Sequence, residues 1–280
     1  MRTILLIAAD SVRALLHQRL LLGLMLVALA MIAIFSSALI GQRKVMTRTA
    51  LDQSAANAPS ARDAGRPPAD ASHMSKEEQQ KLATNLDQMS AMFQAVFYQV
   101  TSFGGSLVSL FIFSTAVASE IRKGTVRITL TKPVSRSQFL LGKYLGGVAV
   151  MAGYALIASV AIILFARFGR LELSPTMKFA PWLMFCRQLM LGSLAMLLSL
   201  FVHPFLAAVL AFFAGNGLYS SHNPLFYVLP SYSPFNVSMQ LLSDTLLRQR
   251  DVLILSLYAG DFIVLMMLIS LWRFRSKELV

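Results

Sequence analysis

Residue types that perform acid–base, nucleophilic or metal chemistry are sparse in this chain. Its 280 residues include one cysteine, Cys186, and four histidines. A single cysteine excludes an internal disulfide, and no Cys/His pattern with metal-ligand spacing is present. An enzyme would need His, Asp, Glu or Cys side chains clustered at one face of the fold, and the sequence offers no such cluster. We therefore expect this chain to have no catalytic residue, no metal site and no bound cofactor.

The segment 119–146 holds the polar residues whose spacing is most constrained. Gly124 permits a turn, and Pro133 ends the short, partly apolar stretch that follows it. Ser135 and Gln138 have the Ser-x-x-Gln spacing of a capping box, which predicts the start of a new helix. The loop is therefore predicted to be a compact, ordered knob with cationic edges.

The elements that must position this loop are membrane helices. The chain is 56% hydrophobic and only 14% charged, whereas a soluble domain carries about 25% charged residues. The apolar residues come in blocks of roughly 20, which match a hydrocarbon core of about 30 Å at 1.5 Å per residue. The net charge of +12 lies mainly beside these blocks, where lipid headgroups explain it and nucleic acid need not be invoked. We predict an all-α integral membrane protein.

Within a domain covering residues 20–280 we predict six transmembrane helices. They are residues 20–40, 95–118, 144–166, 181–202, 204–221 and 252–272. The uncharged stretch 188–221 is long for one span and short for two. His203-Pro204 interrupts its middle, and proline ends or kinks a helix there. The alternative is a chain with five spans.

Charge distribution favours six spans over five. Six place both chain ends and the 119–143 loop on one side, which then carries twelve basic and three acidic residues. Such a surplus marks the cytoplasmic side, whereas five spans would put the basic tail outside. The first span is too long for a signal-peptide core. We expect a multi-pass protein of the inner, or cytoplasmic, membrane with both termini in the cytoplasm.

Two segments flank the first span. Residues 1–19 have the pattern of an amphipathic helix lying at the membrane interface, the alternative being a plain cytoplasmic extension. One face collects its apolar side chains: Ile4, Leu5, Ala8, Val12, Leu15 and Leu16. Residues 41–93 form an outer loop that is expected to be disordered over 55–72 and helical from Ser75 into the second span.

The broken aromatic stretch 222–250, between the predicted fifth and sixth spans, is expected to be re-entrant or interfacial.

Two charged residues lie inside predicted spans. Asp261 is midway along the sixth span, where a bare carboxylate costs about 2.5–3.5 kcal/mol. We expect it to face the bundle interior, forming a structural hydrogen bond or, alternatively, acting in gating or substrate contact. Arg187 is two turns inside the fourth span. It either extends to the outer headgroups, the interpretation that we favour, or lines a cavity for an anionic substrate.

The 119–146 loop resembles the signature of type-2 ABC permeases, including the NosY-like group. The residues that carry the resemblance are Glu120, Gly124, Thr125, Pro133, Arg136, Gly142 and Lys143. A loop that served only as a positive-inside anchor would not need this ordered set. The resemblance extends to the N-terminal helix and the span count, but the 41–93 loop is longer than in the simplest members. No function placed in that loop therefore carries over.

The resemblance implies that residues 119–131 form a coupling helix seated in a separate ATPase subunit. The implied ATPase-coupling residues are Glu120, Arg122, Lys123, Gly124, Thr125, Arg127, Pro133 and Arg136. It also implies a permease dimer, with a second copy or a homologous permease, bound to two cytoplasmic ATPases.

No Gly-x-x-x-x-Gly-Lys-Ser/Thr motif is present, so ATP and Mg²⁺ are expected in the partner ATPase and this chain is not expected to be an enzyme. Other expected partners are membrane lipid and an outer-side accessory protein, without nucleic acid. The expected function is that of an exporter permease. The alternative is an ATP-independent membrane scaffold that recruits partners through its outer loop.

Overall fold

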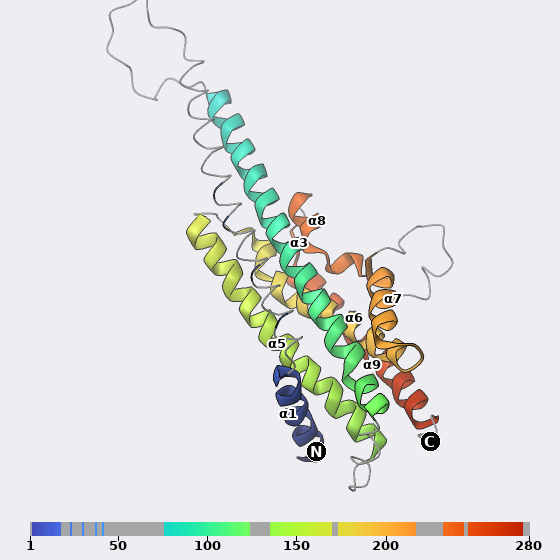
Figure 1. The fold of residues 1–280 in the computed structure, drawn as a ribbon. Coiled ribbons are helices and arrows are strands. Elements are labelled where there is room, and N and C mark those ends of the chain that lie inside the picture. The colour runs from blue at the N-terminus through green and yellow to red at the C-terminus, as the bar shows by residue number, and fades with distance from the viewer. Residues whose placement is uncertain are drawn as a thin grey trace, which may run out of the picture.

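The computed structural model describes residues 2–17, 23, 30, 37, 41, 76–123, 135–169, 173–216, 232–243 and 246–276. Within these residues all regular structure is helical, which confirms the all-α fold class (Figure 1). The α-helices are α1 (Arg2–His17), α3 (Lys76–Lys123), α5 (Arg136–Gly169), α6 (Ala180–Ser199), α7 (Pro204–Asn216), α8 (Val237–Leu242) and α9 (Gln249–Ser276). Two short 3-10 helices, η2 (Pro175–Lys178) and η4 (Ser233–Phe235), precede α6 and α8.

Four of these helices contain segments long and apolar enough to cross a membrane. The segments are Gln88–Ala118, Arg136–Arg167, Ala180–Ser199 and Gln249–Phe274. They coincide with the predicted second, third, fourth and sixth spans. The predicted fifth span begins at α7, an apolar helix of 13 described residues. The predicted first span, 20–40, lies almost entirely outside the described residues, so the total of six stays a prediction.

Helix α3 is one continuous element of 48 residues. At 1.5 Å per residue it is about 72 Å long, more than twice the hydrocarbon thickness of a bilayer. Its N-terminal part therefore projects well beyond the rest of the bundle (Figure 1). The helix predicted to begin at Ser75 is continuous with the apolar segment 95–118, whereas its place on the outer side stays a prediction and the segment 55–72 that we expected to be disordered lies outside the described residues.

Local capping chemistry sets two helix starts as the sequence predicted. The backbone N–H of Gln138 donates to Ser135 Oγ at 3.2 Å, and the N–H of Ser135 donates to Gln138 Oε1 at 3.1 Å. This reciprocal capping box begins α5. At the other break, α6 ends at Ser199 and α7 starts at Pro204, and the N–H of Phe205 donates to His203 Nδ1 at 3.3 Å. The division of the uncharged stretch at His203-Pro204 is confirmed.

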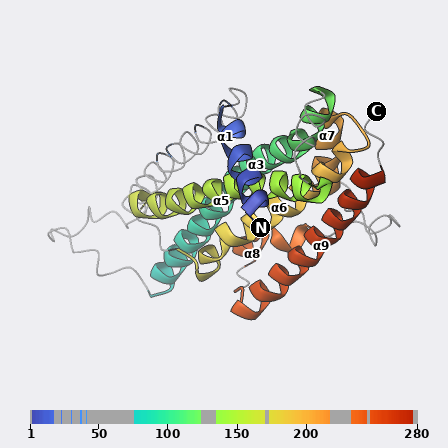
Figure 2. The same ribbon diagram turned by 90° about the horizontal axis from the view of Figure 1, so that it is seen from below.

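Helix α6 lies at the centre of the bundle (Figure 2). It packs against α3, α5, α7 and α9, and 78% of its membrane segment is buried, against 33% for α5 and 22% for α9. Its side chains are apolar nearly all round, as expected for a helix that contacts neighbours on every side. Helices α5 and α9 consequently present wide apolar faces to their surroundings.

Helix α1 packs against the first turns of α5. The side of α1 that meets α5 includes Ile7 and the buried Ser11, while Leu5 and Leu6 are exposed on another side. The predicted single apolar face of residues 1–19 is divided, because Val12 packs against the core whereas Leu5 is exposed. Its position at a membrane interface stays a prediction.

Candidate functional site

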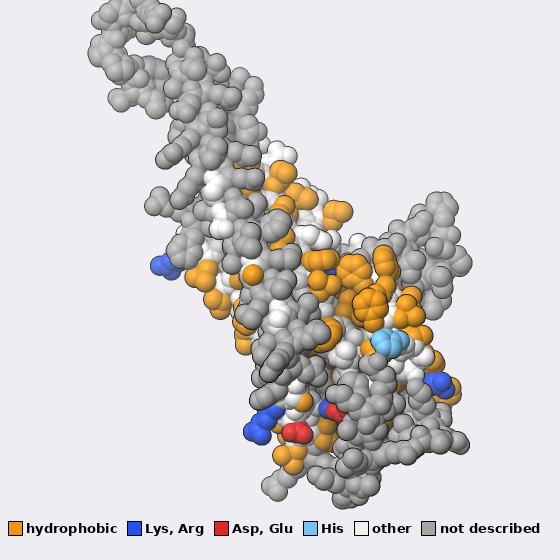
Figure 3. Space-filling view, in the orientation of Figure 1, with side chains coloured by type: hydrophobic (Ala, Val, Ile, Leu, Met, Phe, Trp, Pro, Cys, Tyr) orange, Lys and Arg blue, Asp and Glu red, His pale blue; other side chains and the backbone are white. Residues whose placement is uncertain are grey.

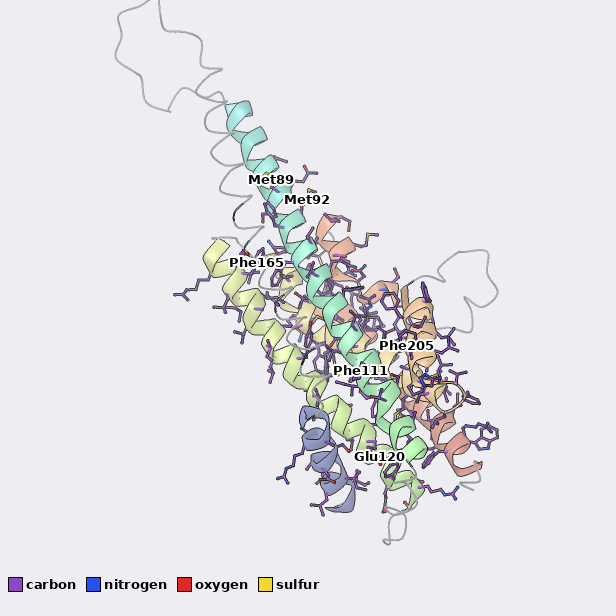
Figure 4. The ribbon with its side chains drawn as sticks, in the orientation of Figure 1. Met89, Met92, Phe111, Glu120, Phe165 and Phe205 are labelled. Carbon is purple, nitrogen blue, oxygen red and sulfur yellow. The ribbon has the colours of Figure 1, made fainter. Side chains whose placement is uncertain are left out.

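The end of the bundle where α3 and α5 meet carries the first candidate site. Glu120, in the last turn of α3, forms an ion pair with Lys143 of α5. Both side chains are partly buried, with exposed fractions of 25% for Glu120 and 13% for Lys143. Lys143 Nζ also lies 5.7 Å from the centre of the Phe139 ring. The pair therefore ties together the two helices that bracket residues 124–134, at the end where Glu120 is labelled (Figure 4).

The structure places the other predicted coupling residues unequally. Arg122 and Lys123 are the last residues of α3, so 119–123 continue this helix instead of opening a separate one. Arg136 is the first residue of α5 and is half-buried. The remaining four predicted coupling residues lie outside the described residues: Gly124, Thr125, Arg127 and Pro133. Most of the predicted coupling helix 119–131 lies outside them as well.

Two glycines let α1 approach this end of α5 closely. A Cβ added at Gly142 would lie 2.6 Å from Ile7 Cγ2, and one added at Gly146 would lie 2.6 Å from Ser11 Cβ. Both distances are shorter than any normal carbon contact, so only glycine fits at either position. The spacing Gly142-x-x-x-Gly146 is the small-residue pattern that brings membrane helices into contact. Our sequence analysis missed this contact, although the spacing could have indicated it.

Charged side chains gather at this end of the molecule. In Figure 3 most of the visible Lys, Arg, Asp and Glu side chains lie at the end that contains α1 and the α3–α5 ion pair, and hydrophobic side chains cover much of the described surface beyond it. This distribution is that of a polar surface next to a membrane-embedded band. The first candidate site therefore lies at the charged end of the described surface.

A buried polar cluster within the bundle forms the second candidate site. Arg187 of α6 has an exposed fraction of 6%, and its Nη1 donates to Ser102 Oγ of α3 at 3.1 Å. The neighbouring Tyr98 hydroxyl donates to the Phe235 carbonyl at 2.8 Å. Arg187 thus ends inside the helix bundle. The interpretation that it extends to the outer headgroups is wrong, because its guanidinium finds a polar partner on α3.

Gln188 extends this cluster and was missed by sequence reasoning. Its side chain is fully buried, and among the described residues neither amide atom has a hydrogen-bond partner. Its backbone carbonyl accepts a bond of 2.6 Å from Ser109 Oγ of α3. A Cβ at Gly105 would lie 1.8 Å from Gln188 Nε2 and 2.6 Å from Tyr154 Cε1, so a larger residue there would displace these side chains. The sequence did contain a signal for this cluster, namely the polar residue Gln188 within an apolar span and the glycine pair Gly104-Gly105 in another span.

Asp261 does not face the bundle interior, contrary to our prediction. It is exposed on α9 and makes no hydrogen bond or ion pair with the described residues. The packed stripe of α9 contains Ala259, Phe262 and Ser270, and successive residues of an α-helix are turned by about 100°. Asp261 therefore points away from the stripe and lies between exposed Leu257 and Val264.

The described residues contain no group of three His, Cys, Asp or Glu side chains arranged to hold a metal ion. Neither candidate site offers the nucleophile and base of a catalytic constellation. The first can dock a partner, and the second can hold helices together or respond to their movement.

Comparison with known families gives a match over nearly the whole chain. A family described as "ABC-2 family transporter protein" matches residues 6–279. The comparison with curated proteins gave no match.

Proposed function

The chain belongs to the ABC-2 family of transporter proteins and is a multi-pass membrane protein with a permease role, and on this premise we propose that it is the membrane subunit of an ATP-driven exporter. ATP and Mg²⁺ bind to a separate cytoplasmic ATPase subunit. That subunit contacts the loop between α3 and α5, whose movement repacks the spans between inward-open and outward-open states. The NosY-like group is the proposed subfamily.

The observation that carries this proposal is the Glu120–Lys143 ion pair at the ends of α3 and α5. Residues 124–134 are covalently joined to α3 and α5, and because this pair ties the two helix ends together, a force on the loop moves them jointly. Helix α3 then packs along α6, the most buried span. A push on a small polar loop is in this way passed to α6, which also contacts α5, α7 and α9. Coupling of ATP hydrolysis to transport requires such a mechanical connection between the ATPase-binding loop and the membrane spans.

We further propose that the chain has six spans in the inner membrane and that both chain ends lie in the cytoplasm. In support, α1, the α3–α5 ion pair and the end of α9 lie at the same end of the bundle (Figure 1). The surplus of basic residues on that side supports the cytoplasmic assignment. The exposed Asp261 supports a permease dimer, because a second permease copy covering α9 would remove an unpaired carboxylate from lipid.

A charge-exchange experiment tests the coupling end. Glu120→Lys and Lys143→Glu each place like charges where the ion pair is, so each should reduce co-purification of an ABC ATPase subunit and the ATP hydrolysis of the complex. The double exchange restores the pair. Full recovery of ATPase association would show that the ion pair positions the loop. Incomplete recovery would show that Glu120 or Lys143 contacts the ATPase directly.

Arg167→Glu is the matched control, because Arg167 is exposed in the last turn of α5, at the opposite end of that helix. It should leave ATPase association unchanged. Each variant must elute as a single species and be compared with the milder Glu120→Gln. Unchanged association in both single exchanges would refute the coupling proposal, and absence of any ATPase partner of the wild-type chain would favour the scaffold alternative.

A further inference from the structure

A groove lies between the second half of α5 and the beginning of α6, away from both candidate sites. Its volume is about 590 Å³, within the range of cavities that hold small organic ligands. Side chains from α5, η2 and α6 line it and are mostly apolar. Those used below are Ala155, Ser159, Ile163, Lys178, Trp182 and Phe185.

The groove runs along a part of α5 that is long and apolar enough to cross a membrane. The α5 residues that line it run from Ala152 to Ile163, within the apolar segment Arg136–Arg167, two thirds of which is not buried in the bundle. Twelve residues of helix span about 18 Å, a little more than half of a hydrocarbon core of about 30 Å. The groove therefore matches an acyl chain of a single leaflet in length, and its lining matches one in polarity.

The mouth of the groove has the chemistry of a membrane interface. Lys178, in the turn before α6, is exposed. One turn further, Trp182 is about half exposed at 51%, and its Nε1 donates to Ser256 Oγ of α9 at 2.8 Å, which holds the indole in place. Lysine and tryptophan at the end of a span are the residue types found at headgroup level. A cation thus lies at the headgroup end of an apolar groove.

We propose that this groove binds an anionic phospholipid of the surrounding membrane, in the leaflet next to η2. One acyl chain lies along Ala155, Ser159 and Ile163, and the headgroup phosphate pairs with Lys178. A small soluble anion does not fit this lining, because a site for it would need several polar groups, whereas the described lining residues are mostly apolar and include one cation, Lys178, at the edge. A zwitterionic lipid fits the apolar part but gains less from Lys178, since its own cation opposes the lysine.

Native mass spectrometry of the full-length protein tests the proposal with two probes, phosphatidylglycerol and phosphatidylcholine of identical acyl chains. Wild-type protein should retain phosphatidylglycerol several-fold more than phosphatidylcholine. Lys178→Gln should bring this ratio close to one. Ser159→Trp should displace both lipids by filling the groove, and the smaller change Ala155→Phe should act in the same direction if the tryptophan disturbs folding.

Val160→Trp provides the matched control, because Val160 is exposed on α5 and does not line the groove. It should bind lipid as the wild type does. Equal retention of phosphatidylglycerol by Ser159→Trp, Ala155→Phe and Val160→Trp would mean non-specific surface lipid and would overturn the proposal. Equal retention of the two lipids by the wild type would overturn the role of Lys178.

Discussion

Two buried glutamines of this protein differ in what their amide groups contact. Gln94 of α3 donates through Nε2 to Ser90 Oγ at 3.2 Å and accepts at Oε1 from the backbone N–H of Ser174 at 3.2 Å. Gln188 of α6 has no hydrogen-bond partner for its side chain among the described residues. A buried amide without a partner loses its hydration and gains nothing in exchange, at a cost of about 1–3 kcal/mol.

This contrast predicts opposite effects of the same substitution. Gln188→Met removes an unsatisfied amide at nearly constant volume, so the free energy of unfolding should stay constant or rise by about 1 kcal/mol. Gln94→Met breaks two hydrogen bonds and should lower it by about 1–3 kcal/mol. Thermal unfolding of both variants in the same detergent measures the difference. A lower unfolding midpoint for Gln188→Met than for Gln94→Met would contradict the assignment.

The residue-scale features were only partly predictable from the sequence. Asp261 and Arg187 stood out because charge inside an apolar span is costly, but their surroundings did not follow from that cost. Which side of α6 or α9 packs inward depends on neighbouring helices, and both spans are apolar on most sides. The sequence therefore indicated that these residues were unusual without indicating that Arg187 meets Ser102 or that Asp261 is exposed.

At the scale of elements, helix starts were predictable because they depend on local chemistry. The Ser135–Gln138 capping box and Pro204 each act within a few residues, so their effect can be deduced from spacing alone. The contact between α1 and α5 is different in kind. It joins residues 7–11 to residues 142–146 and depends on shape complementarity between two helices, for which the sequence contains only the Gly142-x-x-x-Gly146 pattern.

The α1–α5 contact leads to a test by a double-mutant cycle. Gly146→Ala would place a Cβ 2.6 Å from Ser11 Cβ and should destabilise the protein by about 1–3 kcal/mol through overpacking. Ser11→Gly removes the opposing carbon at a cost of about 1 kcal/mol in helix propensity. The double variant should be more stable than the sum of the two losses implies, by about 1 kcal/mol or more. Thermal unfolding midpoints measure all three variants.

Gly153→Ala is the control for this cycle. Gly153 lies on the same helix, and a Cβ there meets nothing within 4 Å. Because alanine is the better helix former by about 1 kcal/mol, this variant should be at least as stable as the wild type. If the changes in the free energy of unfolding caused by Gly146→Ala and Ser11→Gly were strictly additive, residues 11 and 146 would not be in contact.

At the scale of the whole molecule, the helix order places two exposed residues at opposite ends of the bundle. Asp10 lies on α1, beside the start of α5, whereas Arg250 lies at the start of α9. The 28 residues of α9 span about 42 Å, more than the hydrocarbon core. If the bundle crosses the membrane as proposed, Asp10 is in the cytoplasm and Arg250 is outside.

Cysteine labelling tests this arrangement directly, because Cys186 is the single native cysteine and is buried. In a Cys186→Ala background, a membrane-impermeant maleimide should label Arg250→Cys in intact cells and Asp10→Cys only after the membrane is opened. The exchanged pattern would reverse the orientation inferred from the basic residues. Labelling of both positions in intact cells would place them on one side, and the spans between them would then have to be an even number instead of an odd one.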